Sequence, residues 1–410
     1  METLGMRIRK IRKERKLTLA ELAGDRLTKG MLSLIENDKA NPSMDSLAYI
    51  AEQLGIEVSE LLEEVSTSEL RELLETVKKV IIHSNEQQRE RMKLIEPYLE
   101  RLPVSYEAGQ LLVLYSNSKY DIDKVDWEEP LERAIKMFKK MNLMNDWLRA
   151  YILKSSTEFI KHNYKKALDI LLTVKKEVEL NYYVIDELTS LDLLYMVAVE
   201  YLAVGMADEG FVVTNEAIKL SKEKRIFYRI DDLYRLAAVK AMMDYNEQDL
   251  QYYFKKLEQY ADFTEDVPTK RLYLSIKAHY YNTFIKDYEK GNELAEQFKD
   301  LDTSETNMPL YFYYLEKGKS LFGMKRFKDA LEIFNQIGEF SEFIHHPYDL
   351  SIQYELYAYK ALCYEQQGQL AKALEEAKIG VDLVKPLIDT PYKQFINDTY
   401  EKLKKKADGR

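Results

Sequence analysis

The chain has 410 residues, a hydrophobic content of 46% and a formal net charge of −10. This length exceeds one typical core, so we expect either two or more domains or a small domain followed by repeats. A single cysteine, Cys363, excludes an intramolecular disulfide framework and suits a reducing compartment. Residues 1–10 lack an apolar signal core, and no window approaches the roughly eighteen apolar residues of a membrane span. We therefore expect a cytoplasmic protein without a membrane segment, and the few Gly and Pro residues favour helix throughout.

Residues 18–36 predict two short helices joined by a tight turn. Thr18 and Glu21 have the spacing of a capping box, so the first helix begins at about residue 19. Thr28 offers a second N-cap hydroxyl. The helix that follows, over residues 29–36, turns Leu32 and Ile35 inward and leaves three residues outward, namely Lys29, Gly30 and Ser33.

The neighbouring segments complete a small helical domain. Residues 5–13 predict an amphipathic first helix, and a fourth helix follows the break at residues 41–43 and ends at Gly55. A short fifth helix is predicted over residues 58–62. Five short helices in about sixty residues are enough for one independent domain.

Residues 5–62 resemble the helix-turn-helix of the Xre/lambda-repressor class, in the Gly-x-x-Ile-Arg opening, the Leu-Ala of the second helix and the Ile-Glu-Asn of the third. The resemblance implies an ion pair between Arg12 and Glu36. It also implies DNA contacts from the caps and the outward side of the third helix, by Thr18, Thr28, Lys29, Gly30, Ser33 and Asn37. Leu19 and Leu34 depart from the class, which often has Gln and a basic residue at these positions. The alternative is a five-helix domain that does not bind DNA.

The charge distribution supports an N-terminal DNA-binding domain. Residues 1–30 contain four acidic residues and nine basic ones, namely Arg7, Arg9, Lys10, Arg12, Lys13, Arg15, Lys16, Arg26 and Lys29. Residues 63–410 contain 50 basic and 60 acidic residues and carry the whole net charge. Because phosphates repel an acidic body, we expect this part to face away from DNA.

A repeat with a period near 40 residues follows. Its clearest unit, residues 314–334, has the large and small residues of the tetratricopeptide pattern. The corresponding second-helix positions are Ala167, Gly210, Tyr253, Lys290, Ala330 and Ala373. Six helix pairs are predicted, near residues 149–180, 192–222, 235–262, 272–300, 312–340 and 355–385. Such pairs stack into a right-handed α-solenoid with a groove along the first helices.

The groove is the predicted peptide-binding site. An extended peptide exposes amide and carbonyl groups, which Asn, Arg and Tyr side chains can pair. The repeat register places six candidates on the groove side, namely Arg149, Tyr195, Arg235, Tyr245, Asn282 and Lys319. The alternative is that each of them is an ordinary solvated polar residue.

We predict three domains: a helix-turn-helix over residues 1–64, a helical linker over 65–103 and tetratricopeptide-like repeats over 104–405. The linker carries an apolar stripe that includes Leu70, Leu74 and Val77. The stripe either packs on the first repeat or pairs with its copy in a second subunit, which would place two recognition helices on successive turns of DNA.

This domain order resembles the peptide-responsive regulators of Gram-positive bacteria, the Rgg, NprR, PlcR and PrgX group. The resemblance implies a cytoplasmic, homodimeric, quorum-sensing transcription factor. Its partners would be a double-stranded DNA operator and a short imported signalling peptide.

Enzymatic functions are not expected. The five histidines and one cysteine show no metal-ligand spacing, and no P-loop or dinucleotide motif occurs, so we expect neither a metal nor a cofactor. Two other functions stay open. The repeats are a module that sequesters a signalling protein, with DNA binding secondary, or they are purely structural in a constitutive repressor.

Overall fold

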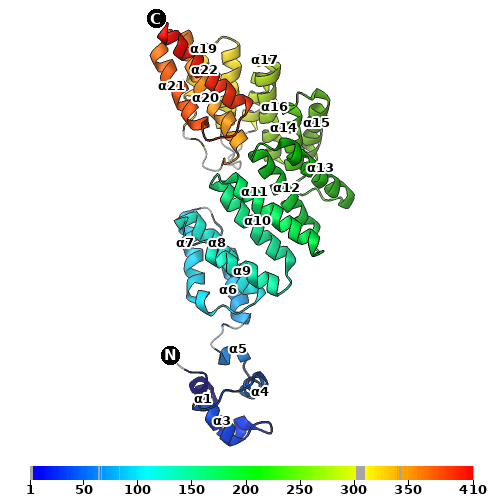
Figure 1. The fold of residues 1–410 in the computed structure, drawn as a ribbon, viewed down its shortest axis with the longest axis vertical. Coiled ribbons are helices and arrows are strands. Elements are labelled where there is room, and N and C mark those ends of the chain that lie inside the picture. The colour runs from blue at the N-terminus through cyan, green and yellow to red at the C-terminus, as the bar shows by residue number, and fades with distance from the viewer. Residues whose placement is uncertain are drawn as a thin grey trace. The chain divides into compact units, whose positions relative to one another are not determined.

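The computed structural model describes residues 3–62, 65, 67–82, 84–301, 310–338, 340 and 344–409, and these residues form helices joined by turns (Figure 1). No strand occurs among them, which confirms the predicted all-α class. The chain has two compact units, residues 1–150 and 151–410. Within the described ranges, no helix is long and apolar enough to cross a membrane.

The first unit begins with five short helices: α1 (Leu4–Glu14), α2 (Leu19–Ala23), α3 (Lys29–Glu36), α4 (Met44–Leu54) and α5 (Val58–Leu61). The predicted capping box is confirmed, because Thr18 Oγ1 accepts the Glu21 N–H at 3.2 Å and Glu21 accepts the Thr18 N–H at 2.7 Å. Gly55 ends α4 in the left-handed conformation, with φ of 62°. The five helices surround a core of fully buried residues that includes Ile8, Leu22, Leu32, Ile50 and Leu54.

The rest of the first unit consists of α6 (Thr67–Lys79), α7 (Asn85–Ile95), the 3₁₀ helix η1 (Glu96–Arg101), α8 (Tyr106–Asp123), α9 (Glu128–Lys140) and the first part of α10 (Met144–Ile160). Both α6 and α7 pack on α8. Leu70, Leu74 and Val77 are buried, so the stripe of α6 is covered within its own chain. Dimerisation and the domain limits at residues 64 and 103 stay predictions.

The second unit is a stack of helical pairs, as predicted. After the rest of α10 and α11 (Tyr164–Leu180) come α12 (Glu187–Ala203) with α13 (Ala207–Lys224), and α14 (Ile230–Met243) with α15 (Glu247–Thr264). Next are α16 (Val267–Tyr280), which continues into the π-helical turn η2 (Tyr281–Ile285), and α17 (Tyr288–Asp300). The last pairs are α18 (Tyr311–Gly323) with α19 (Phe327–Phe334), and α20 (Pro347–Gln366) with α21 (Leu370–Val384). A final helix, α22 (Pro391–Asp408), packs on both α20 and α21.

The turn inside each pair sets the register of the repeats. Two positions before each second helix lies a residue with positive φ, in chain order His162, Gly205, Tyr245, Lys286, Lys325 and Gly368. The fourth residue of each second helix is then buried, and these residues are Ala167, Gly210, Leu250, Gly291, Ala330 and Ala373. The register predicted from the sequence, which used Tyr253 and Lys290, is therefore wrong in two of the six pairs.

Both errors have a local cause. In α14 two buried alanines, Ala238 and Ala241, lie three residues apart on one side of the helix. The predicted register used Ala241, which is twelve positions before Tyr253, but Ala238 is twelve positions before the buried Leu250. In the next pair, η2 adds one residue to the first helix, so the small residue falls one position later. That residue is Gly291, where a Cβ would lie 2.2 Å from Asn282 Oδ1.

Candidate functional site

Helix α3 has one buried and one exposed side. Leu32, Ile35 and Glu36 are buried. The exposed side and the two caps consist of Thr28, Lys29, Gly30, Met31, Leu34 and Asn37, with Ser33 half-buried. None of these residues is a carboxylate, so the exposed side of α3 suits a polyanion.

The predicted DNA-contacting residues also fix the ends of these helices. Thr28 Oγ1 accepts the Met31 N–H at 3.1 Å, and the Asn37 side-chain amide donates to the Ser33 carbonyl at 2.7 Å. Thr18 caps α2 and is exposed. Five of the six residues therefore lie on α3 or its caps, and the sixth is the cap of the preceding helix. Their contact with DNA stays a prediction.

A buried ion pair holds α3 on α1. Arg12 donates from Nε and one terminal nitrogen to the two oxygens of Glu36, at 2.6 and 2.8 Å, and from its other terminal nitrogen to the Leu17 carbonyl at 2.9 Å. The hydrogen bond with Glu36 raises the pKa of Arg12. The pair implied by the resemblance is confirmed, and it fixes the orientation of the exposed side of α3.

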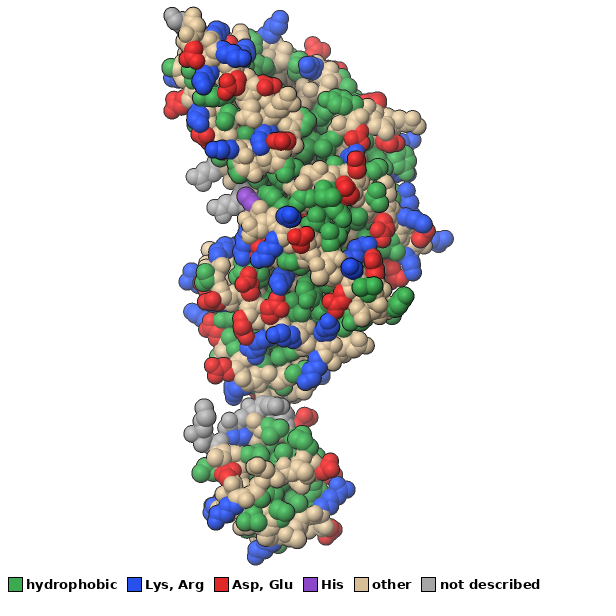
Figure 2. All heavy atoms as spheres, in the orientation of Figure 1, with side chains coloured by type: hydrophobic (Ala, Val, Ile, Leu, Met, Phe, Trp, Pro, Cys, Tyr) green, Lys and Arg blue, Asp and Glu red, His purple; other side chains and the backbone are tan. Residues whose placement is uncertain are grey.

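The second unit has mixed charge on its surface. Over the face that Figure 2 shows, acidic and basic side chains alternate, and hydrophobic side chains gather near the middle of this unit. Acidic and basic side chains are therefore interspersed over this face rather than gathered in separate areas.

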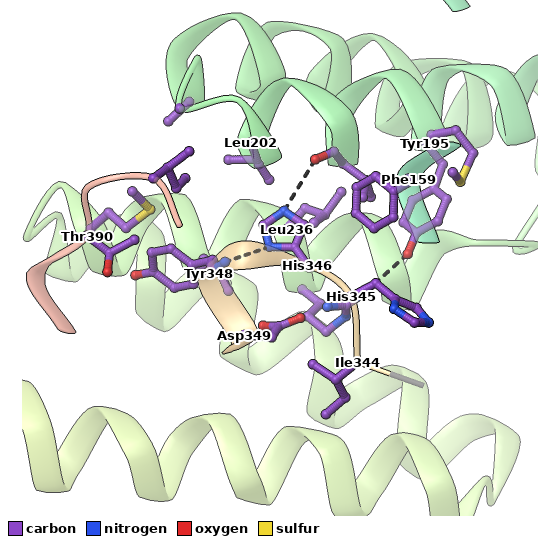
Figure 3. Close-up of a pocket in the computed structure, with 18 of the residues that line it drawn as sticks. Phe159, Tyr195, Leu202, Leu236, Ile344, His345, His346, Tyr348, Asp349 and Thr390 are labelled. Carbon is purple, nitrogen blue, oxygen red and sulfur yellow. Dashed lines mark hydrogen bonds between the residues drawn. The ribbon is translucent and has the colours of Figure 1, made fainter. Parts of the chain in front are cut away.

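A pocket of about 350 Å³ lies in the second unit, between the first helices of early pairs and the start of α20 (Figure 3). Its wall is mostly apolar and includes Phe159, Met196, Leu202, Leu236, Val239 and Met243. Residues 344–346, just before α20, and residues 388–390, just before α22, complete the wall. A pocket with an apolar wall and a few polar groups is typical of a ligand-binding site.

His346 joins two sides of the pocket. Its Nδ1 accepts the Tyr348 N–H at 3.2 Å and caps α20, and its Nε2 lies 3.3 Å from the Val199 carbonyl of α12 (Figure 3). The neighbouring His345 carbonyl accepts the Tyr164 hydroxyl at 2.7 Å. Burial lowers the pKa of His346, so the ring is neutral and fits this pair of hydrogen bonds.

Tyr195 and Arg235 bring polar groups to the pocket. The Arg235 guanidinium donates to the Tyr195 hydroxyl at 3.2 Å and to Asp232 at 3.4 Å. Burial disfavours the charged form of Arg235, but the nearby Tyr195, Asp232 and Asp349 outweigh burial and raise its pKa. Burial also raises the pKa of Tyr195. A neutral hydroxyl and a cation therefore face the pocket, with the Asp349 carboxylate also in its wall.

Of the six predicted peptide-binding residues, only Tyr195 and Arg235 line this pocket. Tyr245 lies on the turn after α14, with 78% of its surface exposed, and Arg149 is exposed on α10 in the first unit. Asn282 and Lys319 are buried, with 3% and 1% exposure. Contact of these residues with a peptide stays a prediction.

Asn282 of η2 and Lys319 of α18 belong to a buried polar network that also includes Glu355 of α20, and His279 of α16 links it to Tyr392 of α22. Lys319 Nζ lies 3.0 Å from Glu355 and 3.3 Å from Glu316, and Asn282 donates to Glu316 at 3.0 Å. Burial opposes ionisation of Glu316, but the charges of Lys319 and His279 lower its pKa to about 2. These side chains are therefore satisfied within the unit.

The sequence analysis missed part of the pocket. The five histidines, which include His345 and His346, show no metal-ligand spacing in the sequence, and in the described residues no group of His, Cys, Asp and Glu could hold a metal ion. His346 lines the pocket beside Tyr348 and Asp349. The Pro347 that starts α20 was the available signal, since proline favours the first turn of a helix and so places His346 at its N-cap.

A buried carboxyl group lies behind the pocket wall, next to Val199. Glu200 is fully buried, and its Oε1 lies 2.6 Å from Ser155 Oγ, which donates to the Ala167 carbonyl at 2.8 Å. Its other oxygen has no hydrogen-bond partner in the described structure. Burial raises the pKa of Glu200 to about 8, so the folded protein binds a proton here at neutral pH.

We expect Glu200 to make the second unit less stable as pH rises from about 5 to 8. In this range the folded state holds the proton and the unfolded state, with a pKa of 4.5, has lost it, so stability falls with increasing pH. Thermal melts at several pH values should show a shallower decline for Glu200→Gln. The same change at the exposed Glu209 should leave the wild-type slope. Equal slopes in all three proteins would contradict a proton on Glu200.

Comparisons with known proteins identify the N-terminal segment. Residues 5–66 match the family model of a helix-turn-helix domain. The immunity repressor protein of Bacillus phage phi105 is 48% identical over 63 residues, which cover 15% of this chain and 44% of the repressor. The chain thus spans less than half of the length of this curated relative. The segment is a helix-turn-helix domain, as the sequence resemblance predicted.

Two solved structures are similar over most of the chain. PlcR from Bacillus thuringiensis, in complex with the peptide PapR7 and DNA, has 22% identity and a TM-score of 0.36, and covers 65% of this chain and 96% of its own. NprR in complex with its cognate peptide NprX has 15% identity and a TM-score of 0.46, and covers 83% and 92%. Both belong to the group that the domain order resembles.

Proposed function

We propose that this protein is a transcription regulator that binds double-stranded DNA through α3 and a short peptide through the pocket of its second unit. The observation that carries the proposal is the exposed side of α3, which has no carboxylate and belongs to a helix-turn-helix domain. The second helix of such a motif lies in the major groove. The protein acts in the cytoplasm as a homodimer, because two copies place two recognition helices on successive turns of DNA.

The pocket supports the peptide part of the proposal. Leu202, Leu236 and Val239 offer an apolar surface for a side chain of the peptide. The Tyr195 hydroxyl and the Arg235 guanidinium can pair its carbonyl groups, and the Asp349 carboxylate can pair an amide or an amine. Peptide binding then changes how the protein binds its operator.

Loss of two polar groups on α3 should weaken DNA binding. We expect Lys29→Ala/Ser33→Ala to bind DNA from upstream of the protein's own gene at least tenfold more weakly, because each position supplies a phosphate or base contact worth about 1 kcal/mol or more. Fluorescence anisotropy at two salt concentrations measures this loss, and removal of Lys29 should reduce the salt slope by about 1.

The matched control is Lys328→Ala, an exposed change on α19 that should bind DNA like the wild type. Equal binding by all three proteins, or none at any salt concentration, would contradict the DNA part. It would favour the alternative of a repeat module that sequesters a signalling protein.

Filling the pocket should weaken peptide binding. Val239 is half-buried and lines the pocket, so Val239→Trp places a large side chain where the peptide would lie. We expect affinity selection from a library of synthetic heptapeptides to enrich peptides on the wild type, with binding to Val239→Trp at least tenfold weaker. Val212→Trp, at an exposed position of α13, should bind like the wild type. If the wild type enriches no peptide while DNA binding is intact, the peptide part is wrong.

A further inference from the structure

Helix α3 exposes two large apolar side chains beside its polar residues. Met31 is 46% exposed and Leu34 is 45% exposed, and they lie three residues apart, one above the other on the same side of the helix. The other apolar residues of α3, Leu32 and Ile35, are buried in the core of the domain. Met31 and Leu34 are therefore not needed to hold α3 in place.

Gly30 lies on the same side of the helix and leaves the backbone there uncovered by a side chain. A Cβ at this position would meet only Thr28 Oγ1, at 3.9 Å, so the domain has space for alanine there. Glycine weakens a helix relative to alanine, so neither packing nor helix stability explains a glycine at position 30. Gly30 and Leu34 are one helical turn apart, and the missing side chain lets a partner approach the backbone next to Leu34.

We infer that Met31 and Leu34 read thymine, through contact with its C5-methyl group in the major groove. This inference rests on the proposed DNA binding. Among the four bases only thymine presents a methyl group there, next to its O4 acceptor, whereas the other three present hydrogen-bonding groups and no methyl group for Leu and Met to contact. An apolar side chain against a hydrogen-bonding group leaves it desolvated and without a partner. The operator therefore contains thymines opposite these two residues.

The experiment removes single methyl groups from the DNA. The full-length protein first selects its binding site from random duplexes, and each thymine of the site is then replaced by deoxyuridine, which keeps the hydrogen bonds and lacks the methyl group. We expect one or more replacements to weaken binding about fourfold, the value for one buried methyl. Leu34→Ala or Met31→Ala should bind the thymine and deoxyuridine duplexes equally at the matching position.

A control variant and the remaining outcomes distinguish an error in the thymine inference from an error in the proposed DNA binding. Met6→Ala changes a residue of α1 that is 54% exposed and should keep the wild-type response to deoxyuridine. Selected sites without thymine enrichment, or equal affinity for both duplexes, would overturn the inference and leave the proposed function intact. If the wild type selects no DNA, both are wrong. If Leu34→Ala lowers the molecular mass in sedimentation but keeps the methyl response, this side of α3 contacts a second copy and the inference is wrong.

Discussion

Arg12→Ala should strongly destabilise the helix-turn-helix domain and weaken DNA binding. The change leaves the Glu36 carboxylate, which is 4% exposed, without its two charge-assisted hydrogen bonds. Breaking a buried ion pair in this way costs about 3 to 5 kcal/mol. A domain of this size has a total stability of roughly 3 to 9 kcal/mol, so the change removes at least about a third of that stability and the packing of α3 on α1 opens far more often.

Hydrogen exchange and DNA binding together measure this effect. Amides of α1 and α3 should lose protection in Arg12→Ala, while those of the second unit keep it. Arg12→Met/Glu36→Leu removes both charges and should restore protection, because apolar replacement of a whole buried pair is often neutral. Lys13→Ala, an exposed change on α1, controls for loss of a basic residue. Unchanged protection of α3 in Arg12→Ala would show that the pair is dispensable.

The second large effect is expected from Lys319→Met. Lys319 is the cation between two buried carboxylates, Glu316 and Glu355, which are 3% and 2% exposed. Removing it leaves like charges close together in the interior, and the low pKa of Glu316 would rise as the protein takes up a proton.

We expect the second unit to lose about 3 to 5 kcal/mol, which lowers its Tm by roughly 10 °C. Calorimetry on the full chain measures this shift. Lys328→Met removes an exposed lysine from α19 and should leave Tm within about 1 °C, since surface charges contribute little. Lys319→Met/Glu355→Gln removes one of the two carboxylates and should recover part of the loss. A Tm for Lys319→Met that equals the control would mean that the network does not stabilise the unit.

Local signals were enough to predict the first domain. The capping box at Thr18, the cap at Thr28 and the stop at Gly55 each depend on residues within a few positions of one another, and the structure contains all three. The Arg12–Glu36 pair followed only from the resemblance, because its partners lie 24 residues apart. The resemblance marks Leu34 as a departure from the class, whereas the inward spacing of Leu32 and Ile35 does not place Met31.

The pocket could not be predicted from periodicity. Register arguments treat each pair alike, but the pocket depends on residues 344–346 reaching α12, a contact that no period contains. The register itself failed where a second alanine or a π-helical turn changed the local spacing. Polar residues were also ambiguous, because the sequence predicts both Lys319 and Arg235 on the groove side of their first helices, but Lys319 lies in a buried network and Arg235 in a pocket wall.

The contacts of residues 345 and 346 change how the second unit should unfold. In a repeat array whose members touch only their neighbours, the end members open first. Here His346 contacts Val199, 147 residues earlier, and Tyr164 contacts His345, 181 residues later. Early and late pairs are thus tied together, and opening one end breaks contacts at the other. The unit should unfold in one cooperative transition. A ligand bound next to the contacts of residues 345 and 346 would stabilise all of its pairs at once.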